Sequence, residues 1–127
     1  MHQVIVVGVD GSDGGFAAVA EGAELARRFN SRLIALSVEE GFPRYAATMG
    51  EVDEFKREKD LYFEHVGERA IRIAEDHAAS LRHEIRIGHA AEAIVRFADE
   101  LGADLIVLGF KGHSGIARSG SDRWPRR

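Results

Sequence analysis

The chain has 127 residues, which is enough for one domain with a single hydrophobic core. Its net charge of -4 argues against general nucleic-acid binding, and the absence of cysteine excludes disulfides, thiol catalysis and thiolate metal sites. No apolar stretch approaches the roughly 18 residues that a membrane-spanning helix needs, and the first residues lack the features of a secretion signal. We therefore expect a cytoplasmic protein that binds neither nucleic acid nor membranes.

Apolar and amphipathic segments alternate along the chain. The segments that favour strands are 3–9, 32–38, 81–88 and 103–108, and those that favour helices are 13 to about 30, 51–79 and 90–101. Ser12 is suited to cap the first helix, and Gly102 is suited to end the third. The order β-α-β-α-β-α-β predicts an α/β fold with an open, parallel, doubly wound sheet.

Two of these segments have one face suited to a core. In the long charged helix 51–79, the residues expected to face the sheet are Phe55, Tyr62, Val66, Ala70 and Ile73. In the segment 81–88 alternate residues point to opposite sides, which fits an edge strand with one wet face. Surface positions are expected for the histidines that lie on separate elements without metal-ligand spacing, which are His65, His77, His83 and His89.

A glycine-rich stretch follows the apolar run 105–108. Its glycines are Gly109, Gly112, Gly115 and Gly120. Glycine lets backbone N–H groups come close to a ligand, and a concave set of such groups binds anions such as phosphate. Because Lys111 adds a positive charge, we interpret the stretch as the phosphate end of a nucleotide site. The alternative is a flexible surface turn.

The ends of three predicted strands support the nucleotide interpretation. In a doubly wound sheet, ligands bind at the carboxyl ends of the strands where the winding direction reverses. Asp10, Val38 and Gly109 all lie at such ends. Taken alone, Asp10 is either a ribose ligand or a turn residue ahead of the helix, and Ser12 is an N-cap rather than a nucleophile.

The motifs together resemble a known family. They are Val-Gly-Val-Asp-Gly-Ser at 7–12, Leu-Ser-Val at 36–38, Gly88 before a helix, Ala-Asp-Leu-Ile-Val-Leu-Gly at 103–109 and Gly109-x-x-Gly112. Across residues 1 to about 121 the chain resembles the universal stress proteins, so we expect one domain of this type over 1–127. The resemblance implies a strand order of 3-2-1-4-5, commonly in a homodimer, with ATP over the carboxyl ends of the first and fourth strands.

The resemblance also implies roles for particular residues. Asp10 would hold the ribose, and the backbone at Val38 would recognise the adenine edge. Gly109, Lys111 and Gly112 would surround the phosphates, and Mg²⁺ would arrive with the nucleotide because the sequence offers no dedicated protein cage. The whole expected site consists of Gly8, Val9, Asp10, Val38, Leu108, Gly109, Lys111, Gly112, His113, Gly120 and Ser121.

The C-terminal part departs from the family pattern. Between Gly112 and the pair Gly120-Ser121 the chain has seven residues, where the ATP-binding branch has nine. Pro125 and the tail arginines are unsuited to the buried fifth strand of the family. We therefore expect the order 3-2-1-4, with the fifth strand missing and 105–108 exposed as a sheet edge. Such an edge would lower the solubility of the protein, pair with another chain or be covered by residues 118–127. Because the fifth strand commonly forms the dimer contact in the family, we do not expect the usual homodimer.

Three functions fit this sequence. The first is a stress-response regulatory module that binds ATP or a related adenine nucleotide. The second is a slow ATPase, but the loop supplies no placed carboxylate base apart from Asp10, so we expect little or no catalysis and name no catalytic residue. The third is a protein-interaction domain that has lost its nucleotide, which the short loop favours. Fold class alone does not separate these functions.

Overall fold

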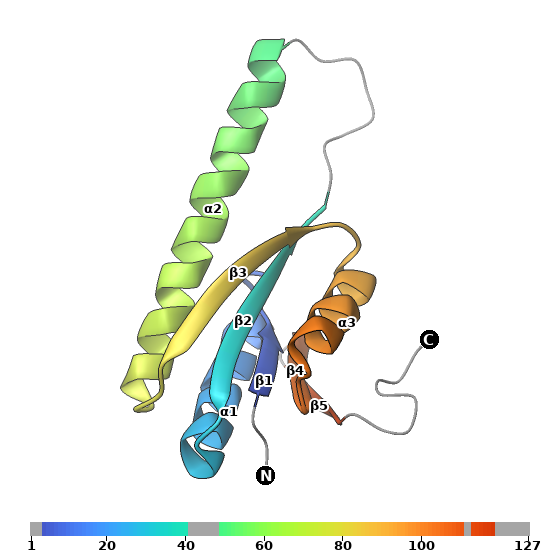
Figure 1. Ribbon diagram of the computed structural model, residues 1–127. Coiled ribbons are helices and arrows are strands. Elements are labelled where there is room, and N and C mark those ends of the chain that lie inside the picture. Colours follow the sequence, from blue (N-terminus) through green and yellow to red (C-terminus); the bar gives the residue numbers. More distant parts are fainter. Residues whose placement is uncertain (1–3, 41–48, 111–112, 119–127) are drawn as a thin grey trace.

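The protein is built on one five-stranded sheet with helices on both faces (Figure 1). The computed structural model describes residues 4–40, 49–110 and 113–118. The elements in chain order are β1 (Val4–Gly8), α1 (Asp13–Phe29), β2 (Arg32–Glu39), α2 (Met49–Asp76), β3 (Leu81–Ile87), α3 (Ala90–Leu101), β4 (Leu105–Phe110) and β5 (His113–Arg118). The strand order β3-β2-β1-β4-β5 confirms the predicted order 3-2-1-4 and the α/β class.

Strand β1 forms the centre of the sheet. Ile5, Val6 and Val7 are fully buried, as expected for a β-branched run that is covered on both faces. The strand pairs in parallel with β2 on one side and with β4 on the other. Because the chain leaves β1 towards β2 and later returns to its other side, the winding direction reverses between β1 and β4.

The sheet separates two hydrophobic cores. One core lies beneath α1 and α2, where Val7 packs among small residues such as Ala23 and Ala70. The other lies beneath α3, where Phe97 packs on Val6 and Ile106. Figure 1 shows this arrangement, with α1 and α2 on one side of the sheet and α3 on the other. The side chains on each face of β1 therefore contribute to one of the two cores.

Helix α1 begins and ends as its sequence predicts. Ser12 is the N-cap, and its hydroxyl oxygen accepts a hydrogen bond from the N–H of Gly15 over 3.1 Å. Asn30 ends the helix in the left-handed conformation. Within the helix, Gly22 allows close packing on β1, because a Cβ atom there would lie 2.7 Å from Cγ2 of Val7.

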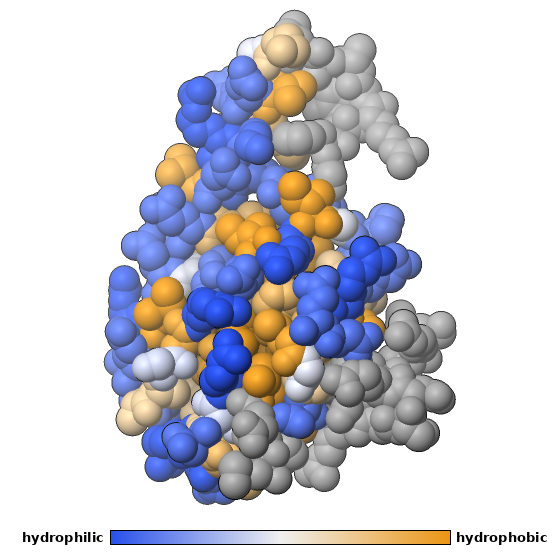
Figure 2. Space-filling view, viewed as in Figure 1, coloured by the Kyte–Doolittle hydropathy of each residue, from blue (hydrophilic) through white to orange (hydrophobic). Residues whose placement is uncertain are grey.

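Helix α2 has 28 residues and extends well beyond the sheet (Figure 1). Val66 and Ala70 are buried as predicted, but Tyr62 is 49% exposed and its neighbour Phe63 is buried in its place. The exposed side of this helix is mostly hydrophilic in Figure 2, in line with its interleaved acids and bases. No helix in the described ranges combines the length and the apolar character that crossing a membrane requires.

The predicted empty edge beside β4 is wrong. Strand β5 occupies that edge and pairs with β4 in antiparallel orientation, with Val107 opposite Ile116. The prediction considered a parallel fifth strand, which needs a crossover helix, whereas an antiparallel strand can follow a short connection. Residues 113–118, expected to belong to a glycine-rich loop, form this strand instead. Residues 119–127 of the tail that was considered as a cover lie outside the described residues.

The pairing of β4 on both sides predicts slow amide exchange at two adjacent residues. Successive N–H groups of a strand point to opposite neighbours, so one of Ile106 and Val107 donates towards β1 and the other towards β5. We expect both amides to exchange slowly in an NMR hydrogen-exchange experiment. Alternate amides of β3, at the other edge of the sheet, are the control and should exchange quickly. Fast exchange at either Ile106 or Val107 would contradict the paired edge.

Candidate functional site

A pocket of about 230 Å³ lies at the carboxyl ends of β1, β2 and β4. It brings together six residues of the predicted nucleotide site, which are Gly8, Val9, Asp10, Val38, Leu108 and Gly109. This is the point where the winding direction of the sheet reverses, the usual ligand position in open α/β sheets. The volume is below the range of roughly 300–1,000 Å³ for whole ligands, so it suits a fragment such as a nucleobase.

Gly8 keeps the pocket open. A Cβ atom at this position would lie 2.7 Å from Cδ2 of Leu108 and 3.2 Å from Cδ1 of Ile94. Ile94 belongs to α3 and, with Ala90 and Leu36, lines the pocket without having been predicted for the site. The available signal is the amphipathic pattern of segment 90–101, which places Ile94 on the apolar side of the helix. The pattern does not reveal that this part of the core faces an opening.

The turn from β1 to α1 places a carboxylate at the mouth of the pocket. Oδ1 of Asp10 accepts hydrogen bonds from the backbone N–H of Ser12 over 3.0 Å and from its hydroxyl over 2.6 Å. Partial burial by itself would raise the pKa of Asp10, but hydrogen bonds, led by these two from Ser12, together outweigh burial and hold the pKa below its ordinary value of 3.8. Asp10 is therefore ionised at neutral pH, and its Oδ2 takes no part in these bonds.

A partly buried chain of hydrogen bonds supports this turn from β2 and β3. The hydroxyl of Ser37, which is fully buried, donates to the carbonyl of Val9 over 2.8 Å. Nε2 of His83 lies 2.8 Å from the same hydroxyl oxygen. Because the Ser37 proton is used on Val9, the imidazole must donate through Nε2. The prediction of a surface position for His83 is wrong, since α2 covers part of β3.

The first turn of α1 explains the glycine at position 109. A Cβ atom on Gly109 would overlap the backbone carbonyl of Gly14, so the end of β4 packs directly on the start of α1. This packing requires glycine whether or not a phosphate binds nearby. Among the other predicted phosphate contacts, His113 begins β5, whereas Lys111, Gly112, Gly120 and Ser121 lie outside the described residues.

The pocket suits an uncharged base, with a polar group of the ligand next to the Asp10 carboxylate. Among the described residues that line the pocket, Asp10 is the one with an ionised side chain, and Ala90 contributes the start of α3. The N-cap of α3, His89, makes no side-chain capping bond, so N–H groups of the first helical turn are available at that edge. Among the described residues there is no cluster of three side chains suited to hold a metal ion. The described part of the site thus offers two kinds of polar binding group, the Asp10 carboxylate and backbone N–H groups of α3.

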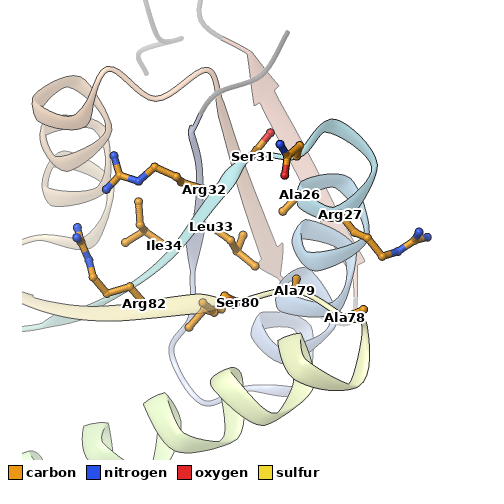
Figure 3. A pocket seen from close by; sticks show the side chains of 12 residues that line it. Ala26, Arg27, Ser31, Arg32, Leu33, Ile34, Ala78, Ala79, Ser80 and Arg82 are labelled. Atoms are coloured by element: carbon orange, nitrogen blue, oxygen red, sulfur yellow. The ribbon is translucent and has the colours of Figure 1, made fainter.

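A larger hollow of about 650 Å³ lies at the opposite end of the strands, near the starts of β2 and β3 (Figure 3). Three arginines line it, but Figure 3 shows Arg27 pointing away from Arg32 and Arg82. Arg27 is also paired with Glu24 over 2.9 Å. Because the charges do not converge and the hollow lies at the amino ends of the strands, we consider the smaller pocket the better candidate.

Comparison with known proteins gives one consistent family. The model of the universal stress protein family matches residues 1–121. Universal stress protein MJ0531 of Methanocaldococcus jannaschii is 28% identical in an alignment that covers 93% of this chain and 70% of that protein. The structure of universal stress protein UspA from Lactobacillus plantarum is similar with a TM-score of 0.74 and 26% identity, over 84% of this chain and 76% of that one.

A second solved structure shows the same fold. It is a crystal structure of a universal stress protein in complex with cAMP, with a TM-score of 0.67 and 24% identity. The similarity covers 83% of this chain and 74% of that chain. Together with the family match over residues 1–121 and the observed strand order, these similarities show that the chain belongs to the universal stress protein family.

Proposed function

We propose that this protein is a regulatory module that binds an adenine nucleotide at the pocket beside Asp10. The observation that carries the proposal is the convergence of Gly8, Asp10 and Val38 with the end of β4 around one opening. A universal stress protein of the same fold was crystallised with cAMP, which makes adenine nucleotides the first ligands to test. ATP remains the expected physiological ligand from the sequence.

In the proposed complex, the base enters the pocket and the sugar stays at its mouth. Leu108 and Ile94 supply apolar walls for the base, and the backbone at Val38 is available for its polar edge. The ionised carboxylate of Asp10 accepts hydrogen bonds from the ribose hydroxyls. The phosphates then extend towards the connection between β4 and β5, where we propose contacts with Lys111, Gly112, His113, Gly120 and Ser121. Mg²⁺ accompanies the phosphates in this proposal.

Strand β5 favours a second candidate function. Residues 113–118 pair with β4, so this part of the glycine-rich stretch is committed to the sheet. A chain whose phosphate loop is shortened in this way would act as a protein-interaction domain without nucleotide. Titration calorimetry with AMP, adenosine and ATP separates the two candidates, because an interaction domain of this kind binds none of them.

Asp10→Asn tests the ribose contact. The substitution keeps the size of the side chain but removes the charge that strengthens hydrogen bonds to sugar hydroxyls. Losing a charge-assisted bond costs about 1.5–3 kcal/mol, so we expect AMP to bind roughly tenfold to a hundredfold more weakly in titration calorimetry. Asp13→Asn, at an exposed position in the first turn of α1, is the matched control and should bind like the wild type. Equal affinities of Asp10→Asn and wild type would show that the ribose lies elsewhere.

Lys111→Ala tests the proposed phosphate contact. Adenosine shares the base and sugar of ATP but carries no phosphate, so the two ligands separate this contact from the rest of the site. We expect the substitution to weaken ATP binding roughly tenfold and to leave adenosine binding unchanged. Lys56→Ala, on the exposed part of α2, controls for a general loss of positive charge. An equal loss of affinity for both ligands would mean that Lys111 does not contact phosphate.

A further inference from the structure

Two successive backbone carbonyls in the turn after β1 are held by side chains from other elements. Ser37 donates to the carbonyl of Val9, and the hydroxyl of Tyr62 donates to the carbonyl of Asp10 over 2.6 Å. Turn carbonyls that lack such partners bond to water and leave the backbone free to adjust. With both carbonyls held, the backbone of this turn has little freedom to rotate.

Tyr62 reaches the turn from the middle of α2. Its ring makes an edge-on contact with Phe63, with 5.2 Å between the ring centroids, and its side chain is half-exposed. Gly11 provides the space for the hydroxyl, because a Cβ atom at that position would overlap it. Gly11 also has a φ of 92°, which favours glycine. Both features, the space for the Tyr62 hydroxyl and the positive φ, favour glycine at position 11.

Ser37 and Tyr62 hold the turn from the face of the sheet opposite the pocket. Ser37 and its partner His83 lie on the side of α1 and α2, whereas the pocket opens beside α3. Burial lowers the pKa of His83, although Glu84 acts in the opposite direction, so the imidazole is neutral at neutral pH. Tyr62, on α2, contacts the carbonyl of Asp10 and is not among the residues that line the pocket.

We propose that Tyr62 is a positioning residue of the nucleotide site. It acts through the backbone of Asp10 and aims the carboxylate at the ribose hydroxyls. The ligand part of this inference rests on the proposed function, whereas the effect on the turn does not. The hydroxyl of Tyr62 belongs to α2, so a shift of that helix alters the direction of the Asp10 carboxylate. Nucleotide binding is thereby linked to the position of α2.

Tyr62→Phe removes the hydroxyl and keeps the ring. The loss of one hydrogen bond predicts roughly two- to tenfold weaker binding of AMP. Binding of 2′,3′-dideoxy-AMP, which has no ribose hydroxyls, should not change. This difference separates positioning of Asp10 from a general loss of structure, which would weaken both ligands. Leu61→Ala, at the adjacent exposed position of α2, is the control and should leave both affinities unchanged.

A second measurement needs no ligand. The amide of Ser12 donates to the Asp10 carboxylate, so its hydrogen exchange reports the order of the turn. Tyr62→Phe should accelerate this exchange several-fold, and Leu61→Ala should not. If the wild type binds neither AMP nor ATP, the proposed function fails, and the role of Tyr62 is decided by the exchange of Ser12 alone. Unchanged exchange at Ser12, or an equal loss of affinity for both nucleotides, overturns the inference.

Discussion

The full burial of β1 is the constraint on which the rest of the structure depends. Its residues Ile5, Val6 and Val7 need cover on both faces, which requires helices on both sides of the sheet. They also need a strand on each side, and with parallel neighbours and right-handed crossovers the chain supplies these by winding in one direction and then in the other. The reversal leaves an opening at the carboxyl end of β1, so the same burial that stabilises the fold also places the pocket.

Glycines keep this opening free of side chains and allow the surrounding elements to pack closely. Gly8 leaves room between Leu108 and Ile94, and Gly109 lets β4 approach the first turn of α1. Gly11 gives the turn its left-handed conformation and admits Tyr62. A side chain at Gly109 would collide with the backbone of Gly14, and one at Gly11 would be strained by the positive φ. A side chain at Gly8 would push Leu108 and Ile94 aside. The glycines therefore shape the turn and the pocket wall even before any contact with a ligand is considered.

Much of the fold could be predicted from the sequence because its signals are local. The apolar run of β1, the cap at Ser12 and the end of α1 near Asn30 all follow from short-range patterns. Strand β5 could not be predicted in this way, because its glycine-rich segment resembles a loop and forms a strand only by pairing with β4. His83 and Tyr62 were also missed in their roles, since both depend on partners that are distant in the sequence.

The most direct test of the central claim is a map of nucleotide contacts by two-dimensional NMR. AMP is added to ¹⁵N-labelled protein, and the chemical shifts of backbone amides are followed to saturation. If the nucleotide binds at the carboxyl ends of the strands, the amides of Gly8, Val38 and Gly109 should shift together. Ala79 and Ser80 line the larger hollow at the amino ends of the strands, and the chemical shifts of their amides should not change. Shifts confined to Ala79 and Ser80, or none at Gly8 and Val38, would contradict the proposed site.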